Sequence, residues 1–166
     1  MFKYILIFLF LFNCTFANEI NLFTSRHYQS DLKLFEKFTN ITGIKVNVIS
    51  GKSKVLEKRI FDEGAQSNAD ILFLADAGAL YSAQKKNLFA KYNQKKIKKI
   101  IPESLRNEFW VGVTKRARIL FYNPENTDST EIKEISYEDL SNQKWRNSIA
   151  IRQANNVYNQ SLIASL

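Results

Sequence analysis

Three short apolar runs that alternate with three helix-like segments are the feature that most constrains this fold. The runs cover residues 19–25, 44–49 and 69–75, and a segment with apolar residues at helical spacing follows each of them. A helix between two strands returns the chain to the same end of the sheet, so the strands become parallel. The order therefore predicts an α/β fold with a parallel, doubly wound sheet and helices on both faces.

The ends of these expected elements carry recognisable signals. Ser30 or Asp31 is expected to cap the first helix, and Gly43 is expected to end it. The first strand alternates apolar and polar residues, whereas the third contains an uninterrupted apolar run, 71–74. Such a run is typical of a strand that is buried on both faces. Asp76 is expected to cap the third helix.

The loops after the strands are the expected binding region, because doubly wound sheets bind ligands at the carboxyl ends of their strands. Those loops cover residues 25–30, 51–53 and 75–78, and the first of them contains His27 and Tyr28. A tyrosine that packs its ring and solvates its hydroxyl is the simpler explanation for Tyr28 alone. A lone histidine is likewise more often an ordinary surface residue than a ligand.

The second half of the chain has a less regular pattern. It predicts three strands, at residues 109–113, 118–122 and 148–152. It also predicts a short helix at 137–140 and a final helix at 156–166. Tyr158 falls in the first turn of the final helix. Arg116 lies in the connection between the first two of these strands, and Arg118 is the first residue of the second. They form either a solvated edge or the partners of an anion in a cleft.

The charge distribution argues against a nucleic-acid-binding protein, although the net charge is +8. Only 7 of the 24 basic residues are arginines, and every basic residue in the one dense basic run, 91–99, is a lysine. That run predicts a solvated helix face, with a partner-docking surface as the second interpretation. The chain has a single histidine and no glycine-rich phosphate loop, so we expect no enzyme.

Residues 1–17 have the pattern of a cleavable signal peptide. Lys3 precedes an apolar stretch, 4–12, and Thr15 and Ala17 are the small residues that a signal peptidase reads. The stretch is too short for a membrane anchor. The signal peptide would direct export to the periplasm. Its cleavage would then remove Cys14, the only cysteine, so folding would need no disulfide.

Four sequence blocks together carry a resemblance to a known family. In chain order they are FTSRHYQSDLKLFEKFTNITGIKVNVISGKSKVL, ADILFLADAGALYSA, WVGVTKRARILFYNP and YEDLSNQKWRNSIAIRQANNVYNQSLIASL. They resemble the ferric-iron-binding periplasmic proteins of ABC-type importers, collinearly from about Glu19 to Leu166. The SRHY and NVYNQS strings are the most specific parts of the match.

The resemblance implies a type II periplasmic-binding-protein fold with two α/β lobes, each built on a parallel doubly wound sheet. Residues 18–118 would form the first lobe, incomplete without later return strands, and residues 119–166 would begin the second. Members of the family are roughly twice as long and have a Tyr-Tyr pair that this sequence lacks. We therefore expect the chain to be a fragment.

The resemblance also implies the site. Tyr28 from the first lobe and Tyr158 from the second would bind Fe3+ as phenolates, and His27 would be a conditional ligand. Arg116 or Arg118 would balance the phenolate charge or hold a synergistic anion such as carbonate. A monomer would close around the ion and deliver it to the membrane subunits of an ABC permease, with no nucleic acid as partner.

The chemistry of the proposed ligands is consistent with a ferric-iron site. Ferric ion is a hard cation, which oxygen donors suit better than thiolates. A phenol in water has a pKa of about 10, so the metal itself must displace the proton and binding must weaken as the pH falls.

Two alternatives remain open on the sequence alone. The same fold could bind another small anion or a polyamine, and a protein of a different class could use its basic surface to bind nucleic acid or another surface. Replacing Tyr28 and Tyr158 by Phe would remove the colour of an iron site but leave an anion site largely intact. Strongly salt-dependent retention on DNA would instead favour the basic-surface protein.

Overall fold

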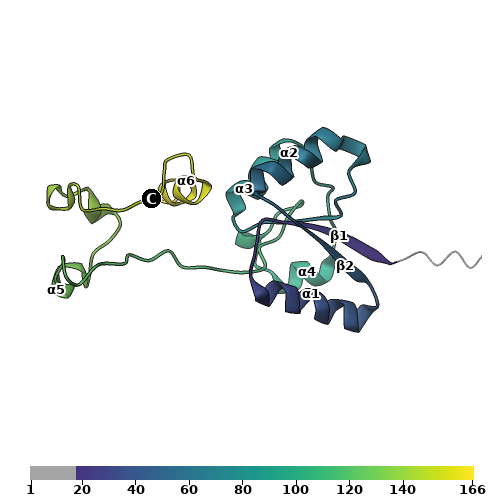
Figure 1. Ribbon diagram of the computed structural model, residues 1–166, viewed down its shortest axis with the longest axis horizontal. Coiled ribbons are helices and arrows are strands. Elements are labelled where there is room, and N and C mark those ends of the chain that lie inside the picture. The colour runs from purple at the N-terminus through teal and green to yellow at the C-terminus, as the bar shows by residue number, and fades with distance from the viewer. Residues whose placement is uncertain (1–17) are drawn as a thin grey trace, which may run out of the picture.

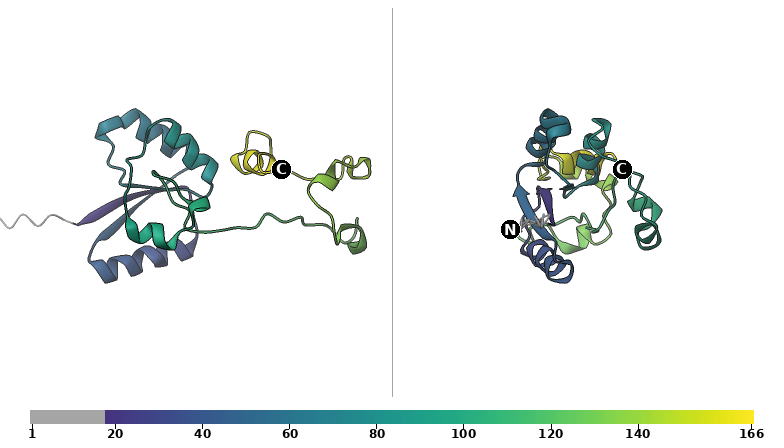
Figure 2. Two further views of the ribbon diagram at one scale, coloured as in Figure 1. Left: turned by 180° about the vertical axis from the view of Figure 1, so that it is seen from behind. Right: turned by 90° about the vertical axis from the view of Figure 1, so that its right-hand side faces the viewer.

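The computed structural model describes residues 18–166, and its centre is a three-stranded parallel sheet. The strands are β1 (Glu19–Thr24), β2 (Lys45–Ser50) and β3 (Ile71–Phe73), in the order β2-β1-β3. The helices α2 (Ser53–Glu63) and α3 (Ala77–Lys85) cover one face, and α1 (Gln29–Thr42) covers the other (Figures 1 and 2). The predicted α/β fold class with a parallel sheet is therefore confirmed.

The remaining elements are short. They are η1 (Gly64–Gln66), α4 (Lys95–Ile100), η2 (Glu103–Leu105), α5 (Ser129–Ile132), η3 (Glu138–Ser141), η4 (Gln143–Trp145) and α6 (Val157–Ile163), where η marks a 3-10 helix. The four lysines of α4 are exposed, as the prediction of a solvated helix face requires.

The burial of the strands differs from the sequence prediction. In β1, Leu22, Phe23 and Thr24 are 6%, 0% and 2% exposed, because this strand is central and has helices over both faces. In β3, Ile71 is 44% exposed, since the strand lies at the edge of the sheet. The expectation that the third strand would be the doubly buried one is therefore wrong for the sheet that residues 18–166 form.

Helix ends were predicted with mixed success. Gly43 ends α1 in the left-handed conformation, with φ 73°, and Asp76 accepts a hydrogen bond at the start of α3, as expected. The first helix, however, begins earlier than predicted, with Tyr28 at the N-cap. Asp31 caps nothing, because its carboxylate is bound to Arg26 instead.

The three strands predicted after residue 108 do not form within the described part of the chain. Val111 makes only a single antiparallel bridge to Arg106, and residues 118–122 and 148–152 have no ladder. A strand exists only when a neighbour accepts and donates its backbone hydrogen bonds, and no neighbour is present here. The chain instead leaves the sheet as a long extended segment, which is drawn in green (Figure 1).

Beyond this segment the chain forms short helical turns and then returns to the sheet. The predicted helix at 137–140 corresponds to η3, and the final helix is α6, which ends before the predicted Leu166. The return brings α6 beside α3 (Figures 1 and 2). The predicted signal peptide, residues 1–17, lies outside the described residues. No helix within residues 18–166 has the length and apolar character that crossing a bilayer requires.

Candidate functional site

The first part of the site is the loop that follows β1. It runs from Ser25 to Tyr28, at the carboxyl end of the central strand, where a parallel sheet presents its ligands. Tyr28 has extended backbone angles at the N-cap of α1 and is 40% exposed. The His27 ring stacks on it with centroids 5.1 Å apart. Both predicted first-lobe residues therefore stand together at the sheet edge and are accessible.

A buried ion pair supports this loop. Arg26 donates two hydrogen bonds to the Asp31 carboxylate, from Nε at 2.7 Å and from Nη2 at 2.9 Å. The two side chains are only 8% and 12% exposed. The Arg26 guanidinium also lies over the rings of Phe73 and Tyr28, at 4.6 and 5.0 Å from their centroids. Arg26 thus ties the Tyr28 ring to β3 and to the first turn of α1.

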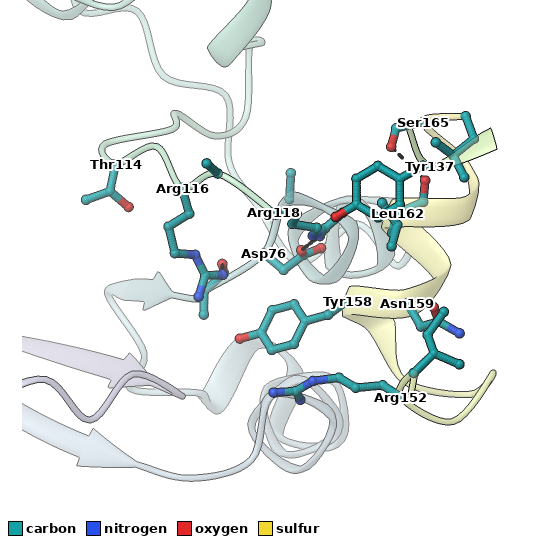
Figure 3. A pocket seen from close by; sticks show the side chains of 15 residues that line it. Asp76, Thr114, Arg116, Arg118, Tyr137, Arg152, Tyr158, Asn159, Leu162 and Ser165 are labelled. Atoms are coloured by element: carbon teal, nitrogen blue, oxygen red, sulfur yellow. Dashed lines mark hydrogen bonds and ion pairs between the residues drawn. The ribbon is translucent and has the colours of Figure 1, made fainter. Parts of the chain in front are cut away.

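The second part of the site is carried by α6. The Asn156 side chain accepts a hydrogen bond from the Tyr158 backbone N–H at 3.0 Å, which fixes the start of the helix. The half-buried Tyr158 ring lies between two guanidinium groups, with Arg116 at 5.2 Å and Arg152 at 5.1 Å from its centroid (Figure 3). A cleft of about 730 Å³ opens beside it, lined also by Asp76 and Arg118.

Arg116 joins the two parts. It donates a hydrogen bond of 2.5 Å to the Ala75 carbonyl, at the carboxyl end of β3. The pKa of Arg116 is raised first by its interaction with the Tyr158 side chain and further by Tyr28, against a lowering by partial burial. The two predicted tyrosines, which are 130 positions apart in the sequence, therefore both act on one guanidinium.

Arg118 has a different position from Arg116. Its Nη2 pairs with Asp76 Oδ2 at 3.2 Å, so a carboxylate already balances its charge. Neither Arg116 nor Arg152 forms an ion pair with a carboxylate among residues 18–166. Of the two arginines that the sequence singled out, Arg116 is therefore the one free to meet an anion.

Sequence reasoning missed three contributors to this site. Arg26 lies inside the SRHY string, yet nothing in the string shows that its partner is Asp31. Arg152 falls in a segment predicted as a strand, where it was one basic residue among many. Asp76 was predicted only as a helix cap, and it also binds Arg118 and Ser161. No sequence signal separates these roles from ordinary surface charges.

The donor set favours a hard, highly charged cation or an anion held beside one. Residues 18–166 contain no cluster of three His, Cys, Asp or Glu side chains able to hold a metal ion. The predicted donors instead lie in two hollows: Tyr158 lines the cleft of about 730 Å³ with Arg116 and Arg152, whereas Tyr28 and His27 line a second hollow of about 250 Å³. Phenolates are hard oxygen donors, and uncompensated guanidinium groups balance their negative charge.

Comparisons with known proteins agree with this chemistry. Residues 66–166 match the model of the bacterial extracellular solute-binding protein family. Iron uptake protein A1 of Synechocystis sp. is 44% identical over 150 residues, which cover 89% of this chain and 41% of that protein. The major ferric iron-binding protein of Neisseria meningitidis is 25% identical over 150 residues, which cover 88% of this chain and 45% of the relative.

Solved structures show the same correspondence. Trichodesmium FutA (IdiA), in complex with iron and citrate ligands, superposes with a TM-score of 0.80 at 44% identity, covering 89% of this chain and 46% of that one. The ferric binding protein from Campylobacter jejuni also has a TM-score of 0.80, at 38% identity, covering 88% and 46%. The chain spans less than half the length of these relatives. Because the family match covers more than half of the chain, the protein belongs to the bacterial extracellular solute-binding proteins.

Proposed function

We propose that this chain contributes ferric-iron binding to an extracytoplasmic solute-binding protein that serves an ABC permease. The observation that carries the proposal is that Arg116 binds the Ala75 carbonyl after β3 and lies over the Tyr158 ring, while Tyr28 is exposed at the carboxyl end of the neighbouring strand β1. The relatives are named as iron uptake and ferric-binding proteins, which supports the same cargo. No reaction is involved, so we propose a binding protein and no enzyme.

Each residue has a role in this proposal. Tyr28 and Tyr158 would supply the phenolates, and His27, whose ring stacks on Tyr28, would be a conditional imidazole ligand. Arg116 and Arg152 would balance the phenolate charge. They could also hold a carbonate or carboxylate beside the ion, as the citrate named in the Trichodesmium structure suggests. Arg118 would not meet the anion directly, because its charge is already paired with the Asp76 carboxylate.

The wider setting is proposed on the same basis. Export by the signal peptide would place the protein in the periplasm as a monomer, with residues 18–118 as one lobe and residues 119–166 as the start of the other. Closure of the two lobes on the ion would present a surface to the permease. Nucleic acid has no place in this function.

The test is a titration of the purified chain with ferric citrate, followed by visible absorption. Phenolate bound to ferric iron absorbs visible light, so we expect a coloured complex that loses its band in the Tyr28→Phe, Tyr158→Phe double variant. Tyr81→Phe is the matched control, because Tyr81 lies on α3 with Lys85 over its ring and outside the cleft lining. An unchanged band in the double variant would contradict the assignment of the ligands.

A second candidate is an anion-binding protein of the same fold. The uncompensated guanidinium groups of Arg116 and Arg152 favour it, and they disfavour a polyamine, because like charges repel. Citrate binding that is equally strong with and without ferric iron, and that survives the double tyrosine substitution, would select this candidate over iron.

A further inference from the structure

Asp76 makes three contacts from one side chain at the carboxyl end of β3. Its Oδ1 accepts hydrogen bonds from the Gly78 backbone N–H at 2.8 Å and from the Ser161 hydroxyl at 2.9 Å. Its Oδ2 pairs with Arg118 at 3.2 Å (Figure 3). The side chain is 9% exposed. One buried carboxylate therefore joins the start of α3, the extended segment and α6.

The contact with Ser161 reaches the helix that carries Tyr158. Ser161 lies one turn after Tyr158, so the two residues share a face of α6. The next residue along the sheet edge, Ala75, accepts the hydrogen bond from Arg116, which in turn lies against the Tyr158 ring. Residues 75 and 76 thus hold α6 and its arginine partner at the carboxyl-terminal edge of the sheet, the edge at which the loop with Tyr28 also lies.

Gly78 makes the approach of α6 to α3 possible. A Cβ atom at this position would lie 3.0 Å from Asp76 Oδ1, 3.1 Å from the Ser161 hydroxyl oxygen and 3.2 Å from Cγ2 of Val157. All three distances are tighter than ordinary van der Waals contact, and two of the three atoms belong to α6. Gly78 does not have a positive φ, unlike Gly43 and Gly64, so its backbone conformation does not require glycine. The missing side chain at Gly78 is therefore explained by the close contact with α6.

We propose that Asp76 and Ser161 form a latch that seats α6 on α3 and so positions Tyr158 opposite Tyr28. They are positioning residues and touch no cargo. The latch lies between residues 18–118 and the returning helix, so its formation closes the cleft and its opening releases Tyr158. This inference rests on the proposed iron-binding function for its purpose, but the latch itself can be tested without iron.

Hydrogen exchange of the α6 backbone amides tests the latch in the full chain. Ser161→Ala removes the hydroxyl that donates a hydrogen bond to Asp76. The α6 amides should then exchange roughly tenfold faster, as expected for the loss of one hydrogen bond to a charged group. Ser165→Ala is the control, because that hydroxyl bonds only to the Leu162 carbonyl at the end of the same helix. Ser161→Thr, which keeps a hydroxyl, should restore slow exchange. Equal exchange in Ser161→Ala and the native chain would overturn the proposal.

Gly78→Ala provides an independent test with effects of opposite sign. Alanine favours a helix over glycine, so the amides of α3 should remain protected or become more so. The added methyl group should at the same time push α6 away and make its amides exchange faster. An α6 that stays as protected as in the native chain would contradict the latch.

Visible absorption with ferric citrate separates the latch from the iron proposal. If both hold, Ser161→Ala should weaken or shift the phenolate-to-iron band, although both tyrosines are intact, and Ser161→Thr should recover it. A native chain that binds no iron but shows the exchange differences would keep the latch and refute the iron function. A band that Ser161→Ala leaves unchanged would show that the latch does not position Tyr158.

Discussion

At the scale of single residues, the Arg26–Asp31 pair is the strongest local constraint on the binding loop. Both side chains are buried, and the two hydrogen bonds between them have short, parallel geometry. Removing one partner of such a pair leaves a buried charge without compensation. The loop that presents Tyr28 therefore depends on the Asp31 carboxylate, which is bound to Arg26 and lines the same hollow as Tyr28.

The pair makes a prediction for the pH dependence of stability. The pKa of Asp31 is held below its ordinary 3.8 by the hydrogen bonds from Arg26. The carboxylate thus contributes stability that is fully present above that ordinary value and is lost as the pH falls through the lowered one. Asp31→Asn should cost about 3 kcal/mol of unfolding free energy at pH 7, with the difference from the native chain shrinking in strong acid.

Urea unfolding at pH 7 and near pH 3 measures this difference. Asp62→Asn is the control, because Asp62 forms an exposed ion pair with Lys58 on α2, with side chains 52% and 74% exposed. Exposed pairs of this kind contribute at most about 0.5 kcal/mol. A gap between Asp31→Asn and the native chain that does not narrow in acid would contradict the role of the pair.

At the scale of elements, α1 depends on how it ends. Gly43 has φ 73° and donates its backbone N–H to the Thr39 carbonyl at 2.8 Å. A Cβ atom there would meet no other atom within 4 Å, so a substitution would not crowd its neighbours. Any loss of stability would come from forcing the new residue into the left-handed conformation. The chain therefore turns from α1 into β2 through a residue in the left-handed conformation.

Gly43→Ala should lower the free energy of unfolding by about 1 kcal/mol, because alanine resists the left-handed conformation. Gly43→Asn should cost clearly less, since asparagine tolerates that region. Urea unfolding of both variants gives the comparison. Equal stability of the alanine variant and the native chain would show that the helix end relaxes without cost.

The element scale also shows how far sequence patterns reach. The three strands, the three helices between and after them, and the residues that end α1 and begin α3 could all be predicted, because caps and periodicity are local properties. The burial of β1 and β3 was assigned the wrong way round. Burial depends on which strand is central, and no local pattern contains that information.

At the scale of the whole molecule, the extended segment is the most unusual feature. Phe121 is 88% exposed, and its neighbours Ile119 and Tyr122 are 61% and 43% exposed. Large apolar side chains in this arrangement are uncommon on a stable surface. The backbone of residues 118–122 also has no strand partner within the described chain. The segment therefore separates the sheet with its helices from the turns that precede α6.

Limited digestion with chymotrypsin should cut first at Phe121 or Tyr122, because cleavage needs an accessible, unpaired backbone. Phe23, which is fully buried, should resist cleavage under the same conditions. Mass spectrometry of the early fragments identifies the sites, and a stable product ending near residue 121 would support the proposed lobe boundary. Early cleavage inside the sheet would contradict that boundary.

The sequence by itself determined the kind of fold and the residues worth watching. Alternating strand and helix patterns specify a parallel α/β sheet, and the SRHY and NVYNQS strings single out Tyr28 and Tyr158. Only the tertiary structure decided which charges matter. Asp76 acquires its role from Ser161, which is 85 positions away, and Arg26 lies over the ring of Phe73 on another strand. Contacts between residues so far apart leave no trace in local sequence.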